Sequence, residues 1–335
     1  MAFSPTLSEL REQVDACLER FLARKSDEIP EGEPLIDEIG RLHRLGGKRL
    51  RPAFCYWGYR APGGVDRPEI VAGASSLELL HTFALVHDDI MDSADLRRGE
   101  KTTRAAHGDN FALLTGDLAL VLADSLLMEC GFPPEVIHRG FAIYSRMRGE
   151  VIAGQYLDVR VAEQPDATER QVRRIAMLKS GLYSVVEPLT IGAVLAGASV
   201  EVVEGLRAMG RPVGEAFQLR DDLLGVFGDS AVLGKSVDSD IREGKKTLLY
   251  VKAMKRASET DRGFLLDRWG GADLATEEVE KLRRIIGRSG AREEIEDLLV
   301  DLRAQAAKAL ASLAIEEEAR EALGHLIEVV IDRDA

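Results

Sequence analysis

The chain is poor in cysteine, and its three cysteines are far apart. Cys17, Cys55 and Cys130 are odd in number and form no CxxC pair. Neither a disulfide framework nor a zinc site is therefore expected. Free thiols fit a reducing compartment, so we predict a cytoplasmic protein.

Positive charge is also scarce, because 44 basic residues stand against 57 acidic ones, for a formal net charge of −13. Nucleic-acid binding depends on a basic surface, and this balance excludes it as the main function. Any anionic ligand must instead be met by cations concentrated at one place.

Long apolar runs are few. The first twelve residues lack a basic segment followed by an apolar one, so no signal peptide is expected. The longest apolar stretch, Leu189 to Val200, is too short to span a bilayer. We predict a soluble protein with no stable membrane insertion.

Strand patterns are nearly absent, whereas apolar residues recur at helical spacing along the whole chain. The predicted fold is all-α, a single domain over residues 1–335. Helices are expected at Thr6–Lys25, Leu35–Leu45, Lys48–Tyr59, Ile70 to the aspartates near residue 90, Asp109–Glu129, Pro134–Val161, Glu169–Lys179, Leu182–Gly197, Glu201–Val226 and, as amphipathic helix, from Lys245 to Asp332.

The same pattern predicts where two helices begin and which four helices lie at the centre of the fold. Asp66 with Glu69, and Thr168 with Gln171, have the spacing of helix N-caps. Helices that are apolar around most of their circumference belong at the centre of such a fold. These are 70–86, 111–128, 182–197 and 202–226, and two of them end in aspartate pairs.

The first aspartate cluster, Asp88, Asp89 and Asp92, closes the apolar helix that begins near residue 70. Asp88 and Asp92 are one helical turn apart, where like charges repel, and the C-terminal end of a helix disfavours carboxylates. Mg²⁺, which binds through one or two carboxylates and phosphate oxygens, would relieve this repulsion. Arg97 and Arg98 follow and suit phosphate oxygens, so the stretch indicates a diphosphate site.

The second cluster, Asp221 and Asp222, ends the helix 201–226. Gln218 lies four residues before Asp222 and shares its helix face. On the first helix, His81 falls on the same stripe as Asp88. One such pair could be a solvated helix end, but two pairs, each followed by a basic loop, favour a ligand-filled cavity.

Several basic segments complement the aspartates. A glycine pair at residues 46–47 precedes Lys48, Arg49 and Arg51 at a helix start, where backbone N–H groups add positive potential. Lys179, Lys235 and Lys245 belong to further basic segments. Each alone is more typical of a charged surface, and only together do they indicate phosphate binding.

These motifs resemble the trans-isoprenyl diphosphate synthase family, also called polyprenyl synthetases, from about Gly46 to Thr247 and in family order. The matches are GGKxxxP at 46–52, DDxxD with Arg-Arg-Gly at 88–99, GQxxD at 154–158, Lys-Thr at 179–180 with Ser180 in place of threonine, FQxxDD at 217–222, and Gly-Lys with EGKxT at 234–235 and 243–247.

The resemblance implies a single helical bundle, the isoprenoid synthase fold, usually a homodimer, with two aspartate motifs facing each other across a central cavity. The substrates would be isopentenyl diphosphate and an allylic diphosphate of C5 to C15. Three Mg²⁺ ions are implied, held by Asp88, Asp92 and Asp221 with support from Asp89 and Asp222.

The family roles carry over by position. Arg97, Lys179 and Lys235 would hold the allylic diphosphate, with Ser180, Gln218 and Lys245 beside them. Isopentenyl diphosphate would be bound by Lys48, Arg51, His81 and Arg98. The catalytic set implied is Asp88, Asp89, Asp92, Lys179, Asp221, Asp222 and Lys235.

One position departs from the family pattern, and another bears on product length. The second motif usually ends in aspartate, whereas this chain has Gly225, which removes outer-sphere support for a metal. Phe83 precedes Asp88 by five residues, roughly 7–8 Å along the helix. An aromatic residue there is similar to geranylgeranyl diphosphate synthases, so we expect a C20 product, with C15 or a longer chain as alternatives.

Three other classes remain possible. A class I terpene cyclase shares the fold and DDxxD motif but needs no isopentenyl diphosphate, and 5% aromatic residues is low for it. A phosphohydrolase centred on His87 and Asp88 would need further histidines in motifs. An inactive helical subunit would not need both aspartate pairs.

Overall fold

The computed structural model describes residues 5–164, 166–228, 239–271 and 273–332. Contacts divide the chain into two compact units. Unit 1 comprises Met1–Ser145, Glu187–Arg207 and Leu313–Leu323, and unit 2 comprises Arg146–Val186, Ala208–Ser312 and Gly324–Ala335. That the whole chain forms one domain around a central cavity stays a prediction.

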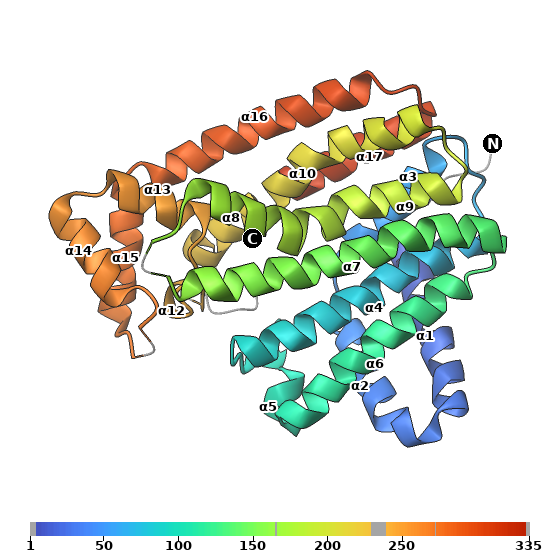
Figure 1. Cartoon of the computed structure of the whole chain (residues 1–335), viewed down its shortest axis with the longest axis horizontal. Helices are drawn as coiled ribbons and strands as arrows, with labels where there is room; N and C mark the ends of the chain where they lie inside the picture. The colour runs from blue at the N-terminus through green and yellow to red at the C-terminus, as the bar shows by residue number, and fades with distance from the viewer. Residues whose placement is uncertain (1–4, 165, 229–238, 272, 333–335) are drawn as a thin grey trace. The chain divides into compact units, whose positions relative to one another are not determined.

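Unit 1 begins with helices that follow the predicted order (Figure 1). They are α1 (Leu7–Glu28), the short 3₁₀ helix η1 (Pro30–Gly32), α2 (Glu33–Arg44), α3 (Leu50–Arg60), α4 (Pro68–Met91), α5 (Thr103–His107) and α6 (Asp109–Met128). Two-residue strands β1 (Leu96–Arg97) and β2 (Glu100–Lys101) form a hairpin between α4 and α5. Helix α4 lies alongside α6 and carries the first aspartate cluster.

Helix α3 packs closely against α9 (Glu187–Leu195) because glycines face the contact. A Cβ atom at Gly192 would lie 1.9 Å from the carbonyl oxygen of Cys55, and one at Gly58 would lie 2.3 Å from that of Leu189. A larger side chain at either position would separate the two backbones. This packing fixes α3, whose first turn follows the glycine-rich loop at residues 46–48.

Unit 2 contains α8 (Glu169–Ala176), the π-helical segment η2 (Met177–Val186), α12 (Ser239–Arg242), α13 (Leu248–Arg256), α14 (Glu259–Arg268), α15 (Thr276–Arg288) and α16 (Ala291–Ala311). Three long helices, α7 (Pro134–Ala162), α10 (Val200–Phe227) and α17 (Glu317–Ile331), each contribute residues to both units. Leu178, Leu182 and Val186 form a buried cluster along η2.

The all-α prediction is confirmed, and the β1–β2 hairpin supplies the only strands in the described part of the chain. The capping box of Thr168 and Gln171 is also confirmed. The predicted cap at Asp66 is wrong, because Arg67 is the N-cap of α4 and Asp66 accepts a hydrogen bond from the Tyr56 hydroxyl. The two helices predicted at 169–179 and 182–197 are one uninterrupted run of α8, η2 and α9, since no residue between them breaks the helix.

Two predictions about apolar helices need correction. Helix α6 is not central, because Leu114, Val121 and Met128 on it are 54%, 58% and 53% exposed. Helices α4 and α6 are also each long and apolar enough to cross a membrane by length and composition, contrary to the prediction that no stretch is. The apolar window of α4 is 72% buried, as in a core helix, and that of α6 is 44% buried.

Candidate functional site

The end of α4 holds a carboxylate that is already paired with an arginine. Asp89 is buried, and both of its oxygens accept hydrogen bonds from Arg97 Nε, at 2.9 and 3.0 Å. Arg97 Nη2 donates to Asp89 Oδ1 at 2.7 Å and lies 3.7 Å from Asp88 Oδ2. Burial opposes the guanidinium charge, but these hydrogen bonds and the attraction of Asp88 and Asp92 raise the pKa of Arg97. The hairpin thus holds one arginine firmly at the acidic helix end.

A small pocket in unit 1 adjoins this pair. It is lined by Leu42, His43, Leu45, Arg49, Glu78, His81, Thr82, Leu85, Val86, Asp89, Arg97 and Arg98. Burial, together with repulsion from Arg49, Arg97 and Arg51, lowers the pKa of Arg98. Such crowding of cations around one pocket favours an anionic ligand.

Two histidines line the same pocket and are held neutral. Burial, together with the positive charge of nearby arginines, lowers the pKa of His43 to about 3 and that of His81 well below its usual value. Near neutral pH each ring therefore offers one N–H donor and one acceptor rather than a charge.

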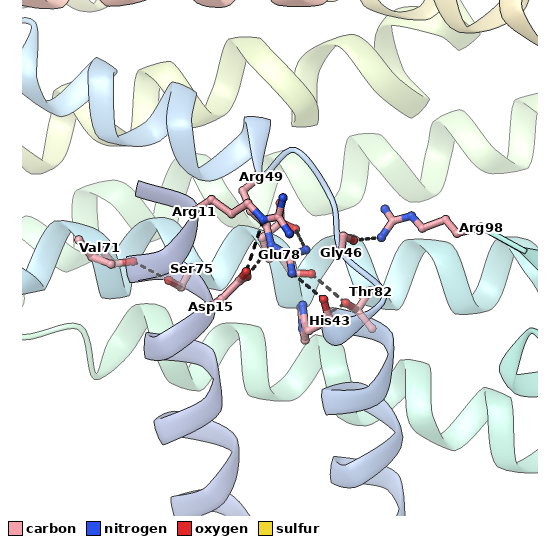
Figure 2. A network of polar contacts seen from close by, with 10 residues as sticks. All are labelled: Arg11, Asp15, His43, Gly46, Arg49, Val71, Ser75, Glu78, Thr82 and Arg98. Carbon is pink, nitrogen blue, oxygen red and sulfur yellow. Dashed lines mark hydrogen bonds and ion pairs between the residues drawn. The ribbon is translucent and has the colours of Figure 1, made fainter. Parts of the chain in front are cut away.

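The three cationic residues that follow the glycine pair differ in how exposed they are. Lys48 is exposed, whereas Arg49 and Arg51 are buried. Arg49 contacts Asp15, Glu78 and the backbone of His43, and Arg98 donates a hydrogen bond from Nη1 to the Gly46 carbonyl oxygen (Figure 2). The sequence singled out Lys48 and Arg51 for substrate binding, and it gave Arg49 no separate role.

In unit 2 the end of α10 carries the second aspartate cluster. Gln218 Nε2 donates to Asp222 Oδ1 at 2.7 Å, which confirms that these residues share a helix face. Burial raises the pKa of Asp222 well above its usual value, and the charges of Asp240, Asp221 and Asp158 raise it further. Four carboxylates thus influence one another here, and a bound cation would relieve their repulsion.

Lys179 reaches the same acidic region from η2. Its Nζ donates to Asp158 Oδ2 of α7 at 2.7 Å. The contact depends on Gly154, because a Cβ atom there would lie 2.5 Å from the Lys179 backbone nitrogen. Asp158 and Lys179, which are 21 residues apart in sequence, therefore form one ion pair, and π-helical segments such as η2 often occur at functional sites.

The position of the missing aspartate is filled by another carboxylate. A Cβ atom at Gly225 would lie only 2.1 Å from Asp240 Oδ2 of α12, so Asp240 occupies the space that a side chain at 225 would need. Lys245 Nζ lies 2.6 Å from Glu243 Oε2 and 3.8 Å from Asp240 Oδ1. Lys235 lies outside the described residues.

The carboxylates suit a hard divalent cation. Within the described residues, no three His, Cys, Asp or Glu side chains already form a group that could hold a metal ion. Mg²⁺ does not need such a cage, because it keeps several waters and completes its shell with phosphate oxygens. The oxygen donors of Asp88 and Asp92 in unit 1, and those of Asp221 in unit 2, are therefore of the kind that Mg²⁺ binds.

Each predicted site residue in the described chain belongs to one of the two units. Unit 1 contains Lys48, Arg51, His81, Phe83, Asp88, Asp89, Asp92, Arg97 and Arg98, and unit 2 contains Lys179, Ser180, Gln218, Asp221, Asp222 and Lys245. Phe83 is buried, and its ring lies 4.8 Å from that of His87. The roles assigned to these residues stay predictions.

Sequence reasoning missed Glu78 and Asp240. A signal for Glu78 was available, because it is the one acidic residue inside the apolar segment 70–86. Asp240 offered no comparable signal, since it lies in a polar segment where carboxylates are common.

An all-α fold, two acidic helix ends and an arginine-lined pocket are typical of helical prenyltransferases. The chain belongs to the polyprenyl synthetase family, whose model matches residues 33–286. It is therefore a transferase of isoprenoid biosynthesis.

Relatives of known product and structure agree with this assignment. A short chain isoprenyl diphosphate synthase of Methanothermobacter thermautotrophicus is 35% identical over 97% of this chain and 98% of its own length. A geranylfarnesyl diphosphate synthase of Aeropyrum pernix is 35% identical over 87% of this chain and 92% of its own. A geranylgeranyl pyrophosphate synthase of Corynebacterium glutamicum, solved with isoprenyl diphosphate and magnesium, is 30% identical with a TM-score of 0.93, covering 98% of this chain and 100% of that one.

Proposed function

We propose that this prenyltransferase condenses isopentenyl diphosphate with an allylic diphosphate of C5 to C15 and releases all-trans geranylgeranyl diphosphate, C20. The observation that carries the proposal is the pocket of unit 1. It is lined by Arg97 and Arg98, and Asp89 at the end of α4 is also among its lining residues. A diphosphate is the ligand whose charge and shape suit forked arginine donors next to oxygen ligands for a cation.

The reaction begins when the allylic C–O bond breaks and negative charge develops on the departing diphosphate. Arg97, held by Asp89, together with Lys179, Lys235 and Lys245, would stabilise that charge, with Gln218 and Ser180 beside them. Because Arg97, Lys179 and Lys245 are held by carboxylates before the reaction, they would favour the transition state over the ground state. The isopentenyl double bond then attacks the carbocation, and a proton passes to the departed diphosphate.

Isopentenyl diphosphate would be bound by Lys48, Arg51, Arg98 and the neutral His81. No protein nucleophile takes part. We place Mg²⁺, three ions in all, on Asp88, Asp92 and Asp221, with Asp222 in support. When bound, Mg²⁺ supplies Lewis-acid stabilisation of the leaving oxygens.

Product length would be limited by Phe83. Its ring is buried on α4, five residues before Asp88, and packs against His87. We expect Phe83→Ala to lengthen the product beyond C20, measured by chromatography of the dephosphorylated alcohols. Phe21→Ala, which removes a buried ring from α1, is the control and should leave product length unchanged. Unchanged product length in Phe83→Ala would show that Phe83 does not limit chain growth.

We propose a homodimer formed through α6. Leu114, Val121 and Met128 are exposed at intervals of seven residues, which places them along one stripe of the helix. A second copy of the chain would cover this stripe. The alternative that the hydropathy of α6 allows is contact with a lipid surface. Val121→Glu should convert a dimer to a monomer in light scattering; a wild-type monomer that binds vesicles would refute the dimer.

The protein is proposed to act in the cytoplasm, without stable membrane insertion and without nucleic acid. Its net charge of −13 supports the last point.

One assay tests the proposed activity. Purified protein is incubated with Mg²⁺, labelled isopentenyl diphosphate and each allylic diphosphate in turn, and the products are sized. We expect C20, abolished by EDTA and restored by Mg²⁺. Release of diphosphate without chain elongation would refute the proposal and favour a cyclase or a hydrolase.

A further inference from the structure

Arg49 is a buried cation that donates hydrogen bonds to three protein groups. It is 5% exposed, and its Nε donates to Asp15 Oδ1 of α1 at 2.8 Å. Its Nη1 donates to Glu78 Oε2 of α4 at 3.0 Å, and its Nη2 to the His43 carbonyl oxygen at the end of α2 at 2.7 Å. One side chain thus ties together three helices, as Figure 2 shows.

The backbone around Arg49 is unusual in a way that these contacts explain. Gly46, Gly47 and Arg49 have φ angles of +87°, +156° and +48°. Glycine adopts such angles freely, but for arginine the left-handed conformation is unfavourable and needs support from its surroundings. The conformation turns Arg49 inward while its neighbour Lys48 is exposed, and the Arg49 carbonyl oxygen accepts the first hydrogen bond of α3, from Ala53.

The loop held in this way also carries a contact to the pocket. Arg98 donates a hydrogen bond to the Gly46 carbonyl oxygen, so the position of that carbonyl affects where the Arg98 guanidinium lies. Lys48 follows directly, and Arg51 lies in the first turn of α3. Three of the four groups proposed to bind isopentenyl diphosphate therefore depend on the path of residues 46–49.

We propose that Arg49 is a positioning residue for isopentenyl diphosphate: it does not touch the substrate, but it fixes the loop that places Lys48, Arg51 and Arg98. The inference rests on the proposed function. Its consequence is selective, because the allylic diphosphate is assigned to other groups, among them Lys179 of unit 2. Loss of Arg49 should raise KM for isopentenyl diphosphate and leave KM for the allylic substrate near its wild-type value.

A single substitution is a poor test by itself. Glu78 is 3% exposed, and its Oε1 atom has no hydrogen-bond partner among the described residues, so removing Arg49 would leave an uncompensated buried carboxylate. Such a change destabilises a protein whatever the role of the arginine, whereas replacing both partners by apolar residues of similar size is often neutral. The informative variant is therefore Arg49→Met combined with Glu78→Leu.

The matched control removes another ion pair of unit 1. Arg207 Nη2 donates to the buried Glu187 Oε2 at 3.1 Å, and neither residue is among those lining the pocket. Arg207→Met with Glu187→Leu therefore reports the general effect of losing such a pair. Arg49→Lys is a second variant. Lysine retains the charge, but its single ammonium group cannot reach the three acceptors that the forked guanidinium of arginine reaches.

The measurements are KM for each substrate, kcat and Tm. We expect Arg49→Met/Glu78→Leu to raise KM for isopentenyl diphosphate roughly 10- to 100-fold, as small misplacements of binding groups do. KM for the allylic substrate should stay within about twofold, and Tm should match that of the control pair. Arg49→Lys should show the same selective change, and it is sufficient if the double variant does not fold.

Wild-type KM for isopentenyl diphosphate in Arg49→Lys and the double variant would overturn the inference. So would equal rises in both KM values, or the same rise in the control pair, since each indicates a purely structural role. Failure of the proposed function is a separate result, in which the wild-type protein itself elongates no allylic substrate.

Discussion

The acidic helix ends of the two units differ in how their charge is balanced. In unit 1, Asp89 is held by two hydrogen-bonding nitrogens of one arginine, and further arginines line the adjoining pocket. In unit 2, Asp222 is buried near three other carboxylates, and the nearby lysines are engaged with Asp158 and Glu243.

The difference shows what each cluster still requires. The pocket of unit 1 is lined by arginines, and burial together with their positive charge lowers the pKa of Arg98 and of two histidines, so this pocket suits an anion. At the end of α10 in unit 2, burial and the charges of three neighbouring carboxylates raise the pKa of Asp222, so this cluster suits a cation. In the proposed reaction, a magnesium diphosphate would supply both.

The largest effect should come from removing a proposed metal ligand. We expect Asp88→Asn and Asp221→Asn each to lower kcat about 10²- to 10³-fold, the usual loss when one preorganised charge contact is removed. Steady-state kinetics at saturating substrates and Mg²⁺ measures this. Asp37→Asn in unit 1 and Asp267→Asn in unit 2, both exposed, should retain wild-type kcat. Unchanged kcat in Asp221→Asn would contradict the proposed role of unit 2 in the reaction.

A smaller loss is expected when the arginine fork of unit 1 becomes a point charge. Arg97→Lys keeps the charge but cannot donate two parallel hydrogen bonds to Asp89. Charge-assisted hydrogen bonds contribute about 1.5–3 kcal/mol, so kcat/KM for the allylic substrate should fall roughly 10- to 100-fold. If lysine served equally well, the rigid pairing in unit 1 would have no catalytic value.

The next prediction concerns the space beside Gly225. Gly225→Ala places a methyl group where Asp240 Oδ2 lies, so we expect a loss of about 1–3 kcal/mol in the free energy of unfolding, and weaker Mn²⁺ binding. Gly287→Ala is the control, because its Cβ meets no atom within 4 Å, and it should stabilise α15 by about 0.5–1 kcal/mol. Chemical denaturation and Mn²⁺ titration distinguish the two. Equal behaviour of both variants would mean that Asp240 moves aside without cost.

The smallest effect near neutral pH is the acid sensitivity of unit 1. The pKa of His43 is about 3 in the folded protein, below the value near 6.5 expected when unfolded, so the unfolded chain binds more protons between these values. The stability contribution is therefore complete above pH 6.5 and is lost as the pH falls toward 3, by at most about 1.4 kcal/mol per pH unit.

Urea unfolding at several pH values between 7 and 4 tests this. His43→Gln should flatten the dependence of the unfolding free energy on pH, whereas the exposed His138→Gln should not. The same slope in wild type and His43→Gln would show that folding does not lower the pKa of His43.

Much of the fold could be predicted because helical periodicity extends along nearly the whole chain. The ends of helices were harder. Asp66 has the spacing of an N-cap, yet its carboxylate bonds with Tyr56, a contact between side chains that spacing alone does not reveal. Glycines 154 and 192 likewise gave no hint of which backbone they would meet.

The candidate site, too, could be predicted only in part from the sequence. Gln218 and Asp222 could be paired from sequence because they lie on one helix, four residues apart. The pairing of Arg49 with Asp15 and Glu78 joins three helices, so only the folded chain shows that this cation is occupied. The spacing of Lys48, Arg49 and Arg51 is equally compatible with all three binding phosphate.

The central claim is that both acidic clusters act on one diphosphate. A double-mutant cycle of Asp88→Asn and Asp221→Asn, read out as kcat, tests it directly. Groups that act as a unit are strongly non-additive, so the double variant should be about as slow as the slower single variant. A double variant whose loss equals the product of the two single losses would show that the clusters act independently, and would contradict the account.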